Sequence, residues 1–382
     1  MSPRSIQTRS RFAEGRERPS ILIVDDSVVA RAVISRAIGL NGRFTVAGAV
    51  PHAKAALAFL ANHQVDGILL DIEMPGVNGL TALPALLEAG AGAKILIVSS
   101  SCGDGAAATI EALALGAADT LEKPDIGDFA SRFSTALDEK LFRLFETAPG
   151  PAPAHRPVRA RAPARVLSPA DAQSPGSDRS ADRSADRAGA GFDIVAIGAS
   201  TGGIHALNLL LHEIPASFQL PILITQHLPE AFMPYFAAQI AVLAGRPCDV
   251  AADRMRIQPG RVIVAPGTAH IRVVGNSDNA SIRLSNEFVT SGCTPSVDPM
   301  FDSLAQVYGA RAMAIVLSGM GRDGSEGALR IIERGGSIVV QDQESSVVWG
   351  MPGTIATNGT PCTIMPPTEI GRMVASGRRP AC

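Results

Sequence analysis

The chain is poor in charge, in cysteine and in long apolar runs, and each shortage excludes a class of protein. Charged side chains make up only 18% of the 382 residues, against roughly 25% in ordinary globular proteins. The 34 basic and 36 acidic residues leave a net charge of −2, which argues against binding of nucleic acid by bulk charge. No apolar run approaches the ~18 residues that a membrane-spanning helix needs, so we expect no direct membrane insertion.

The five cysteines are few, odd in number and far apart. None has CxxC spacing, so we expect neither a disulfide framework nor a structural zinc site. The first residues also lack the apolar stretch of a secretory signal. Hydrophobic residues make up 46% of the chain, which is ample for cores, and roughly 100–200 residues per domain predicts two or three domains. We therefore expect a multi-domain protein of the cytoplasm.

Composition divides the chain into four parts. Residues 1–19 are polar and rich in Arg, and residues 146–191 are rich in Pro, Ala, Arg and Ser, with almost no large aliphatic side chains. Because neither segment can build a core, we expect a disordered tail and a flexible linker. Residues 20–145 and 192–375 are the two predicted domains.

In both domains, short strands that are apolar throughout alternate with helical patterns. Strands of the first domain are expected at 21–24, 44–50, 67–70, 94–98 and 119–122, with helices at 28–40, 53–61, 80–87, 109–115 and 126–145. Strands of the second are expected at 193–197, 221–225, 312–317 and 337–340, with short β-pieces within 248–290 and helices at 202–211, up to about 243, 297–308 and 325–334. This alternation predicts an α/β fold, in which a five-stranded parallel doubly wound sheet precedes a larger doubly wound domain.

Five polar residues follow strands of the first domain. Asp25 and Asp26 follow the first strand, Asp71 the third, Ser99 the fourth and Lys123 the fifth. Because the carboxyl ends of parallel strands meet at one edge, we expect one pocket there. Three carboxylates suit a hard cation such as Mg²⁺, beside which Asp71 could attack a phosphoryl donor. The alternative that Asp26 and the serine after it only cap the next helix stays open.

These residues stand in motifs that resemble response-regulator receiver domains. The motifs are Val-Asp-Asp-Ser at 24–27, Asp-Ile-Glu-Met-Pro-Gly at 71–76, Val-Ser-Ser at 98–100 and Lys-Pro at 123–124. The resemblance implies that Asp71 is the phosphoacceptor, that Ser99 and Lys123 sense the phosphoryl group, and that Asp25, Asp26, Asp71 and the backbone carbonyl of Glu73 hold Mg²⁺. Receivers usually carry an aromatic residue three positions before the lysine, where this chain has Thr120.

The second domain contains a Ser, a His and an Asp that also follow strands. Ser200 lies in Gly-Ala-Ser-Thr-Gly-Gly, a tight turn between a strand and a helix, whose glycines let the backbone bend and a substrate approach. His227 ends the next strand, and Asp323 lies in a glycine-rich turn after residue 317. A nucleophile, a general base and an orienting carboxylate need this arrangement.

The residues alone leave alternatives open. His205 could replace His227 as the base, and Asp298 or Asp342 could replace Asp323. The turn could also bind a nucleotide, although its spacing is not that of a dinucleotide loop. The chain order Ser, His, Asp differs from that of α/β-hydrolases, so fold analogy to them fails.

Further motifs make the second domain similar to the catalytic domain of chemotaxis protein-glutamate methylesterases. They are Ile-Gly-Ala-Ser-Thr-Gly-Gly at 197–203, Gln-His at 226–227, Val-Ala-Pro-Gly at 264–267, Pro-Ser-Val-Asp at 295–298, Ser-Gly-Met-Gly-Arg-Asp-Gly at 318–324 and Gly-Met-Pro at 350–352. The resemblance implies Ser200 as nucleophile, His227 as base and Asp323 as orienter. It also implies Met320 at the oxyanion site, with Thr201 assisting at the turn. Ala231 replaces a glycine that is usual in the family.

The combined resemblance implies a phosphorylation-regulated enzyme. It would remove methyl esters from glutamates of methyl-accepting chemotaxis receptors and deamidate glutamines, with a chemotaxis histidine kinase as phosphodonor. Mg²⁺ is expected in the receiver, and no cofactor in the catalytic domain. From the domain order we expect the unphosphorylated receiver to cover the catalytic cleft. The alternatives are a non-catalytic, phosphorylation-controlled binding module and, less favoured without a helix-turn-helix pattern, a transcription regulator.

Overall fold

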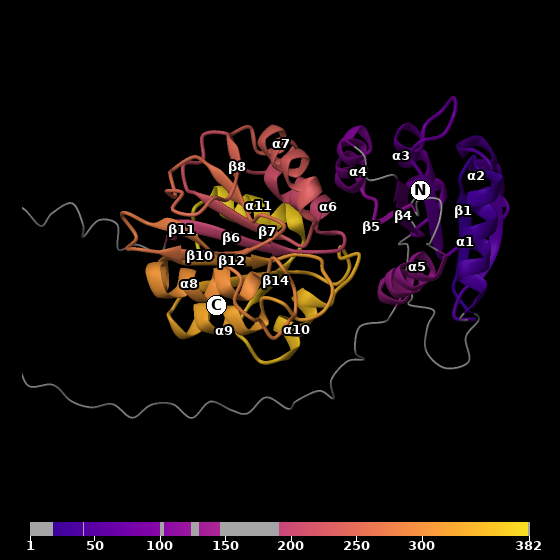
Figure 1. Cartoon of the computed structure of the whole chain (residues 1–382). Coiled ribbons are helices and arrows are strands. Elements are labelled where there is room, and N and C mark those ends of the chain that lie inside the picture. Colours follow the sequence, from indigo (N-terminus) through magenta and orange to yellow (C-terminus); the bar gives the residue numbers. More distant parts are fainter. Residues whose placement is uncertain (1–17, 41, 100–102, 124–129, 146–190, 381–382) are drawn as a thin grey trace, which may run out of the picture.

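The computed structural model describes residues 18–40, 42–99, 103–123, 130–145 and 191–380. Nearly all of the expected tail and linker, together with Cys102 and Cys382, lies outside these ranges. Two α/β domains lie side by side, and α4, β5 and α5 of the first domain face the second (Figure 1).

The first domain is a five-stranded sheet with helices on both faces. Its strands are β1 (Ser20–Val24), β2 (Thr45–Val50), β3 (Gly67–Asp71), β4 (Lys94–Ser99) and β5 (Asp119–Glu122). Its helices are α1 (Val28–Leu40), α2 (Ala53–Leu60), α3 (Gly79–Ala89), α4 (Gly103–Leu115) and α5 (Ala130–Phe145). The strand order is β2-β1-β3-β4-β5 and every pair is parallel, which confirms the predicted doubly wound sheet.

The continuous apolar strands are explained by burial on both faces. In β1, Ile21 and Ile23 belong to the core under α1 and α5. The alternate residues Leu22 and Val24 belong to the core under α2, α3 and α4, because successive side chains of a strand point to opposite faces. Helix α4 begins at Gly103, six residues before the predicted start at 109, because the Ala-rich segment before Thr109 favours helix without an amphipathic pattern. Residues 126–129 of the last predicted helix lie outside the described residues.

The second domain is built on a larger parallel sheet. Its strands are β6 (Ile194–Ala199), β7 (Ile222–Gln226), β8 (Cys248–Val250), β9 (Val262–Val264), β12 (Ala312–Val316), β13 (Ser337–Gln341) and β14 (Thr363–Met365). They run in the order β14-β13-β12-β6-β7-β9-β8, all parallel. The antiparallel strands β10 (His270–Val274) and β11 (Ser281–Ser285) form a separate pair.

Helices cover both faces of this sheet (Figure 1). One face packs against α6 (Gly203–His212), α7 (Met233–Ala244) and α11 (Pro367–Ala375), and the other against α8 (Val297–Tyr308), α9 (Ser325–Glu333) and α10 (Met351–Thr357). Two 3₁₀ turns, η1 (Glu230–Phe232) and η2 (Gly309–Arg311), precede α7 and β12. The predicted doubly wound fold is confirmed. Three short elements, α10, β14 and α11, were not predicted, because three to nine residues show little periodicity and both helices carry Pro in the first turn.

The topology fixes where a site can form. The chain leaves β6 toward β7 on one side and later returns to β12 on the other, so the order reverses between β6 and β12. Loops at such a switch point diverge and leave a crevice beyond the carboxyl ends of the strands. Among the described residues, no helix is both long and apolar enough to cross a bilayer.

Candidate active site

The polar residues of the receiver converge at one edge of its sheet. Asp25 and Asp71 are each 1% exposed, and the Lys123 Nζ lies 3.2 Å from Asp25 Oδ2 and 2.6 Å from Asp71 Oδ2. The carboxylates of Asp25, Asp26 and Asp71 offer oxygens within 4.8 Å of one another. Ser99 Oγ lies 2.9 Å from the hydroxyl of Thr109. The three carboxylates and Lys123 therefore meet at one edge of the sheet.

The electrostatics of this pocket fit a cation and a phosphoryl group. Burial raises the pKa of Asp71, although Lys123 and the Glu73 amide act to lower it. Burial acts to lower the pKa of Lys123, but its hydrogen bond and charge interactions with Asp71 and Asp25 raise it overall. The ammonium of Lys123 is the charge that faces both buried Oδ2 atoms, so an ion such as Mg²⁺ would have to share these oxygens with Lys123 or displace it.

The capping alternative is resolved in favour of the serine. Ser27 Oγ accepts a hydrogen bond of 3.2 Å from the Ala30 amide at the start of α1, as an N-terminal cap does. Asp26 is exposed and belongs to the carboxylate cluster instead.

In the second domain, Ser200 sits on the turn between β6 and α6. Its amide donates to the Ser318 carbonyl at 3.0 Å, and its carbonyl accepts from Gln226 Nε2 at 2.9 Å. The turn needs glycine at 202, which has a φ of +75° and whose added Cβ would lie 2.5 Å from Val347 Cβ. The turn is thereby fixed against the end of β7 and the loops that follow β12 and β13.

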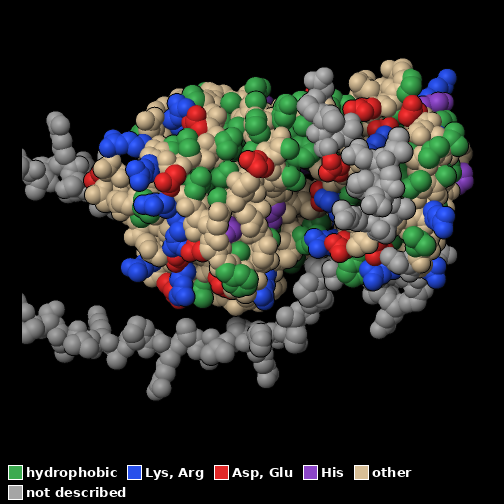
Figure 2. All heavy atoms as spheres, viewed as in Figure 1, with side chains coloured by type: hydrophobic (Ala, Val, Ile, Leu, Met, Phe, Trp, Pro, Cys, Tyr) green, Lys and Arg blue, Asp and Glu red, His purple; other side chains and the backbone are tan. Residues whose placement is uncertain are grey.

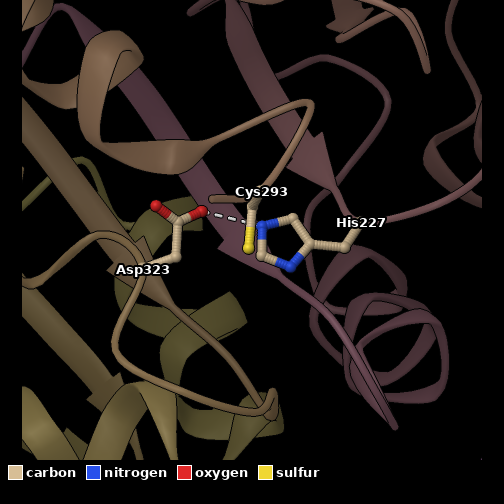
Figure 3. A group of neighbouring side chains, drawn as sticks. All are labelled: His227, Cys293 and Asp323. Carbon is tan, nitrogen blue, oxygen red and sulfur yellow. Dashed lines mark hydrogen bonds and ion pairs between the residues drawn. The ribbon is translucent and has the colours of Figure 1, made fainter. Parts of the chain in front are cut away.

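His227 follows β7 and contacts Asp323 directly. Ala199 pairs with Gln226 in the sheet, so Ser200 and His227 are the next residues along adjacent strands. The His227 Nε2 donates to Asp323 Oδ2 over 2.7 Å (Figure 3), because an ionised carboxylate can only accept. This bond leaves Nδ1 as the ring nitrogen free to act as a base.

Further hydrogen bonds hold Asp323 in place. Its Oδ1 accepts from Ser296 Oγ at 2.6 Å and its Oδ2 from the Val297 amide at 2.8 Å. Burial acts to lower the pKa of His227, but the hydrogen bonds and charges of Asp323 and then Cys293 raise it to about 9.

The rival residues have other hydrogen-bond partners than His227. The His205 Nδ1 donates to the Ala114 carbonyl of the receiver at 3.0 Å. Asp298 Oδ1 accepts from the Gly327 amide at 2.7 Å, and Asp342 interacts with Ser345. Of the aspartates weighed, Asp323 is the one that the structure brings to His227.

A cavity of about 440 Å³ lies at the turn that carries Ser200, and Ser200, Thr201, His227 and Met320 are in its lining. Its lining extends to Asp119 and Lys140 of the receiver. Figure 2 shows a narrow gap between the domains, with charged side chains along its receiver side.

Two contributors were not predicted. Cys293 lines the cavity, and Asp119 Oδ2 accepts a hydrogen bond of 2.8 Å from Thr201 Oγ1. The only sequence signal for Cys293 is its place two residues before the Pro-Ser-Val-Asp motif. Asp119 has none, because its contact depends on how the domains dock.

The fold and the cavity define a class, a phosphoryl-receiver domain joined to an α/β output domain with a Ser-His-Asp constellation at its switch point. The profile of the CheB methylesterase family matches residues 195–374, and that of the response regulator receiver domain matches residues 21–132. The chain belongs to the CheB methylesterase family, since relatives share more than a third of their residues with it over nearly its whole length.

Two of these relatives illustrate the similarity. The protein-glutamate methylesterase/protein-glutamine glutaminase 1 of Paramagnetospirillum magneticum is 37% identical, with 92% of this chain and 93% of the relative covered. The corresponding enzyme of the group 2 operon of Bradyrhizobium diazoefficiens is 38% identical, with 93% and 92% covered. The crystal structure of the Thermotoga maritima CheB methylesterase catalytic domain covers 48% of this chain and 98% of its own, at 30% identity and a TM-score of 0.47.

Proposed function

We propose that the protein hydrolyses the methyl esters of glutamate side chains on methyl-accepting chemotaxis receptors and deamidates glutamines by the same route. The observation that carries this proposal is the hydrogen bond between the buried Asp323 and His227, which lines the same cavity as Ser200. The names of the relatives support the choice of substrate. A binding module would have no need for an imidazole oriented by a buried carboxylate beside a serine.

We propose the following roles for the residues, which the His227–Asp323 hydrogen bond and the lining of the cavity support. Ser200 Oγ attacks the ester carbonyl, and His227 Nδ1 takes its proton and gives it to the departing methoxide oxygen, which leaves as methanol. Asp323 fixes the imidazole through Nε2. Met320 belongs to the loop that faces the turn, and Thr201 lies in the turn two residues before α6. We propose that backbone amides of these two segments stabilise the oxyanion at the cavity that both residues line. Water then hydrolyses the acyl-enzyme. These steps use only residues of this chain, so we propose no cofactor in the catalytic domain.

In the receiver, we propose that Asp71 accepts a phosphoryl group from a chemotaxis histidine kinase. Asp25, Asp26, Asp71 and the Glu73 carbonyl would hold Mg²⁺, which when bound offsets the charge of the transferred group. Ser99 and Lys123 would then bind the phosphoryl oxygens, and Lys123 would exchange its ion pair with Asp71 for one with the phosphoryl group.

The docked receiver supports a role in control. Thr201, next to Ser200, donates to Asp119, and the Gly202 amide donates to the Ala118 carbonyl at 2.9 Å. Lys94, whose pKa burial lowers to about 8, donates to the Val347 carbonyl at 2.9 Å. These contacts hold the start of β5 against the turn that carries Ser200, and β4 against the loop after β13. Phosphorylation that loosens them would open the cavity. We propose residues 146–191 as the linker that permits this movement, between domains at 20–145 and 192–375.

The test is the release of labelled methanol from membranes that carry methylated receptors. Full-length protein with a phosphorylated receiver should release it, and Ser200→Ala should not. Thermal unfolding of the variant serves as the control for folding. Release by neither protein would favour the binding-module alternative or another ester, and equal release by both would exclude Ser200 as nucleophile.

A further inference from the structure

The catalytic cavity contains one reactive side chain that ester hydrolysis does not use, the thiol of Cys293. A ligand atom from each of His227, Cys293 and Asp323 lies within 4.8 Å of the other two. Figure 3 shows the sulfur beside the imidazole ring, on the side that faces Asp323. The three residues come from three loops, one after β7, one before α8 and one after β12.

This donor set is one that zinc takes. A thiolate, an imidazole and a carboxylate bind Zn²⁺ at about 2.0–2.3 Å, and three protein ligands leave a fourth position for water. Hard cations such as Mg²⁺ prefer sites made only of oxygen. We propose that His227, Cys293 and Asp323 form an inhibitory site for Zn²⁺ within the catalytic cavity.

The local structure suits such a site with small movements. Asp323 is fixed by Ser296 and the Val297 amide. His227 and Cys293 are both partly exposed at the cavity, so they can adjust. The 2.7 Å between His227 Nε2 and Asp323 Oδ2 must widen to roughly 3 Å, the separation of two ligands on one ion at these bond lengths. Binding displaces the Nε2 proton, to Nδ1 or to solvent, and the proton of the thiol.

An ion in this position would stop catalysis. It would replace the His227–Asp323 hydrogen bond that orients the imidazole, and it would pull the ring away from the geometry that Ser200 requires. The inhibitory effect therefore rests on the proposed triad, whereas metal binding itself does not.

The receiver provides an internal contrast. Its cluster of Asp25, Asp26 and Asp71 offers only oxygen, which selects for Mg²⁺. The cluster in the cavity adds sulfur and nitrogen, which select for zinc. Mg²⁺ would therefore bind the receiver, and Zn²⁺ the catalytic domain, of the same chain.

The direct test of the metal site is the absorption spectrum of Co²⁺, a coloured substitute for Zn²⁺, added to the metal-free full-length protein. One equivalent should give a thiolate-to-cobalt band in the near ultraviolet and the visible bands of a tetrahedral ion. Cys293→Ser, which changes one atom, should lose the thiolate band. Cys248→Ser is the matched control, because Cys248 is another partly buried free cysteine but lies on β8, and it should keep the band. This measurement needs no turnover, so it stands even for a protein without esterase activity.

The second arm is inhibition of methanol release by Zn²⁺, with each variant compared with its own metal-free rate. The concentration that halves the rate should rise at least about tenfold in Cys293→Ser, because a ligand is lost, and should stay unchanged in Cys248→Ser. A cobalt spectrum without a thiolate band, or equal zinc sensitivity in Cys293→Ser and the natural protein, would overturn the proposal.

Discussion

At the scale of single residues, Asp323 is a carboxylate with 1% exposure that accepts hydrogen bonds from His227, Ser296 and the Val297 amide. Burial acts to raise the pKa of this carboxyl, but the hydrogen bonds and the charge of His227 outweigh it and lower the pKa to about 2. Asp323 is therefore ionised at neutral pH. A fixed negative charge at this point keeps the imidazole in one orientation and stabilises its protonated form.

The first prediction concerns this charge. Asp323→Asn should lower kcat for methanol release by about 10³–10⁴-fold, because the amide cannot hold the imidazole in the same tautomer. The matched control is Asp302→Asn, which alters another carboxylate of the same domain that pairs with Arg272 at 2.9 Å and does not line the cavity. If the control loses as much activity as Asp323→Asn, the assignment of Asp323 as orienter is wrong.

The second prediction concerns pH. His227 must be neutral to take the proton of Ser200, and its pKa is raised to about 9. Below that value the protonated fraction dominates, so kcat/KM should rise by about tenfold per pH unit from pH 7 and level off above about 9. In Asp323→Asn the raising charge is gone, so the residual activity should level off at lower pH. A profile that is flat from pH 7 to 9, measured with chelator present, would contradict this role of His227.

At the scale of elements, the turn from β6 into α6 depends on backbone that a larger residue cannot occupy. Gly202 combines a φ of +75° with a neighbour, Val347, that leaves no room for a Cβ. Gly359 also has a positive φ, +87°, but nothing lies within 4 Å of an added Cβ. Substitution at Gly359 therefore tests backbone strain alone, whereas substitution at Gly202 tests backbone strain together with steric clash.

Alanine at these positions should reflect that difference. Gly359→Ala should lower the free energy of unfolding by about 1–2 kcal/mol, the cost of left-handed backbone with a Cβ. Gly202→Ala should lose a further 1–3 kcal/mol or so from overpacking, and should also lower esterase activity by shifting Ser200. Chemical denaturation of both variants measures this. Equal losses would mean that the Val347 contact relaxes without cost.

Whether the sequence could predict a site residue depended on the element to which that residue belongs. Asp25, Asp71, Ser200 and His227 follow buried strands, and parallel topology alone places such residues at one edge. Cys293 does not follow a strand, and its position beside His227 depends on the path of the loop before α8. The helices and strand after residue 350 were missed for a related reason, since short segments show too little periodicity to be identified.

At the scale of the whole molecule, the receiver and the catalytic domain meet at the turn that carries Ser200. Asp119 joins the two, since it accepts from Thr201 Oγ1 at 2.8 Å and pairs with Lys140 of its own domain at 2.9 Å. His205 and Asn208 of α6 both donate to the Ala114 carbonyl of α4. The sequence predicted that the receiver covers the cleft, but could not identify these partners.

The fourth prediction concerns this contact. Asp119→Ala should raise methanol release by the unphosphorylated protein by about 2–10-fold, the equivalent of one lost hydrogen bond in the docked state. Asp138→Ala is the control, because it removes an ion pair with Arg43 inside the receiver and should leave the rate unchanged. Equal rates for Asp119→Ala and the natural protein would show that this bond does not restrain the cavity.

The central claim is that Ser200 is a nucleophile activated by His227. A fluorophosphonate probe, which reacts with activated serines, tests it most directly when the modified peptide of the phosphorylated full-length protein is identified by mass spectrometry. We expect one equivalent of probe on Ser200, with labelling strongly slowed in His227→Ala and Asp323→Asn. Probe on any other residue, or equal labelling of Ser200 in His227→Ala, would contradict the account.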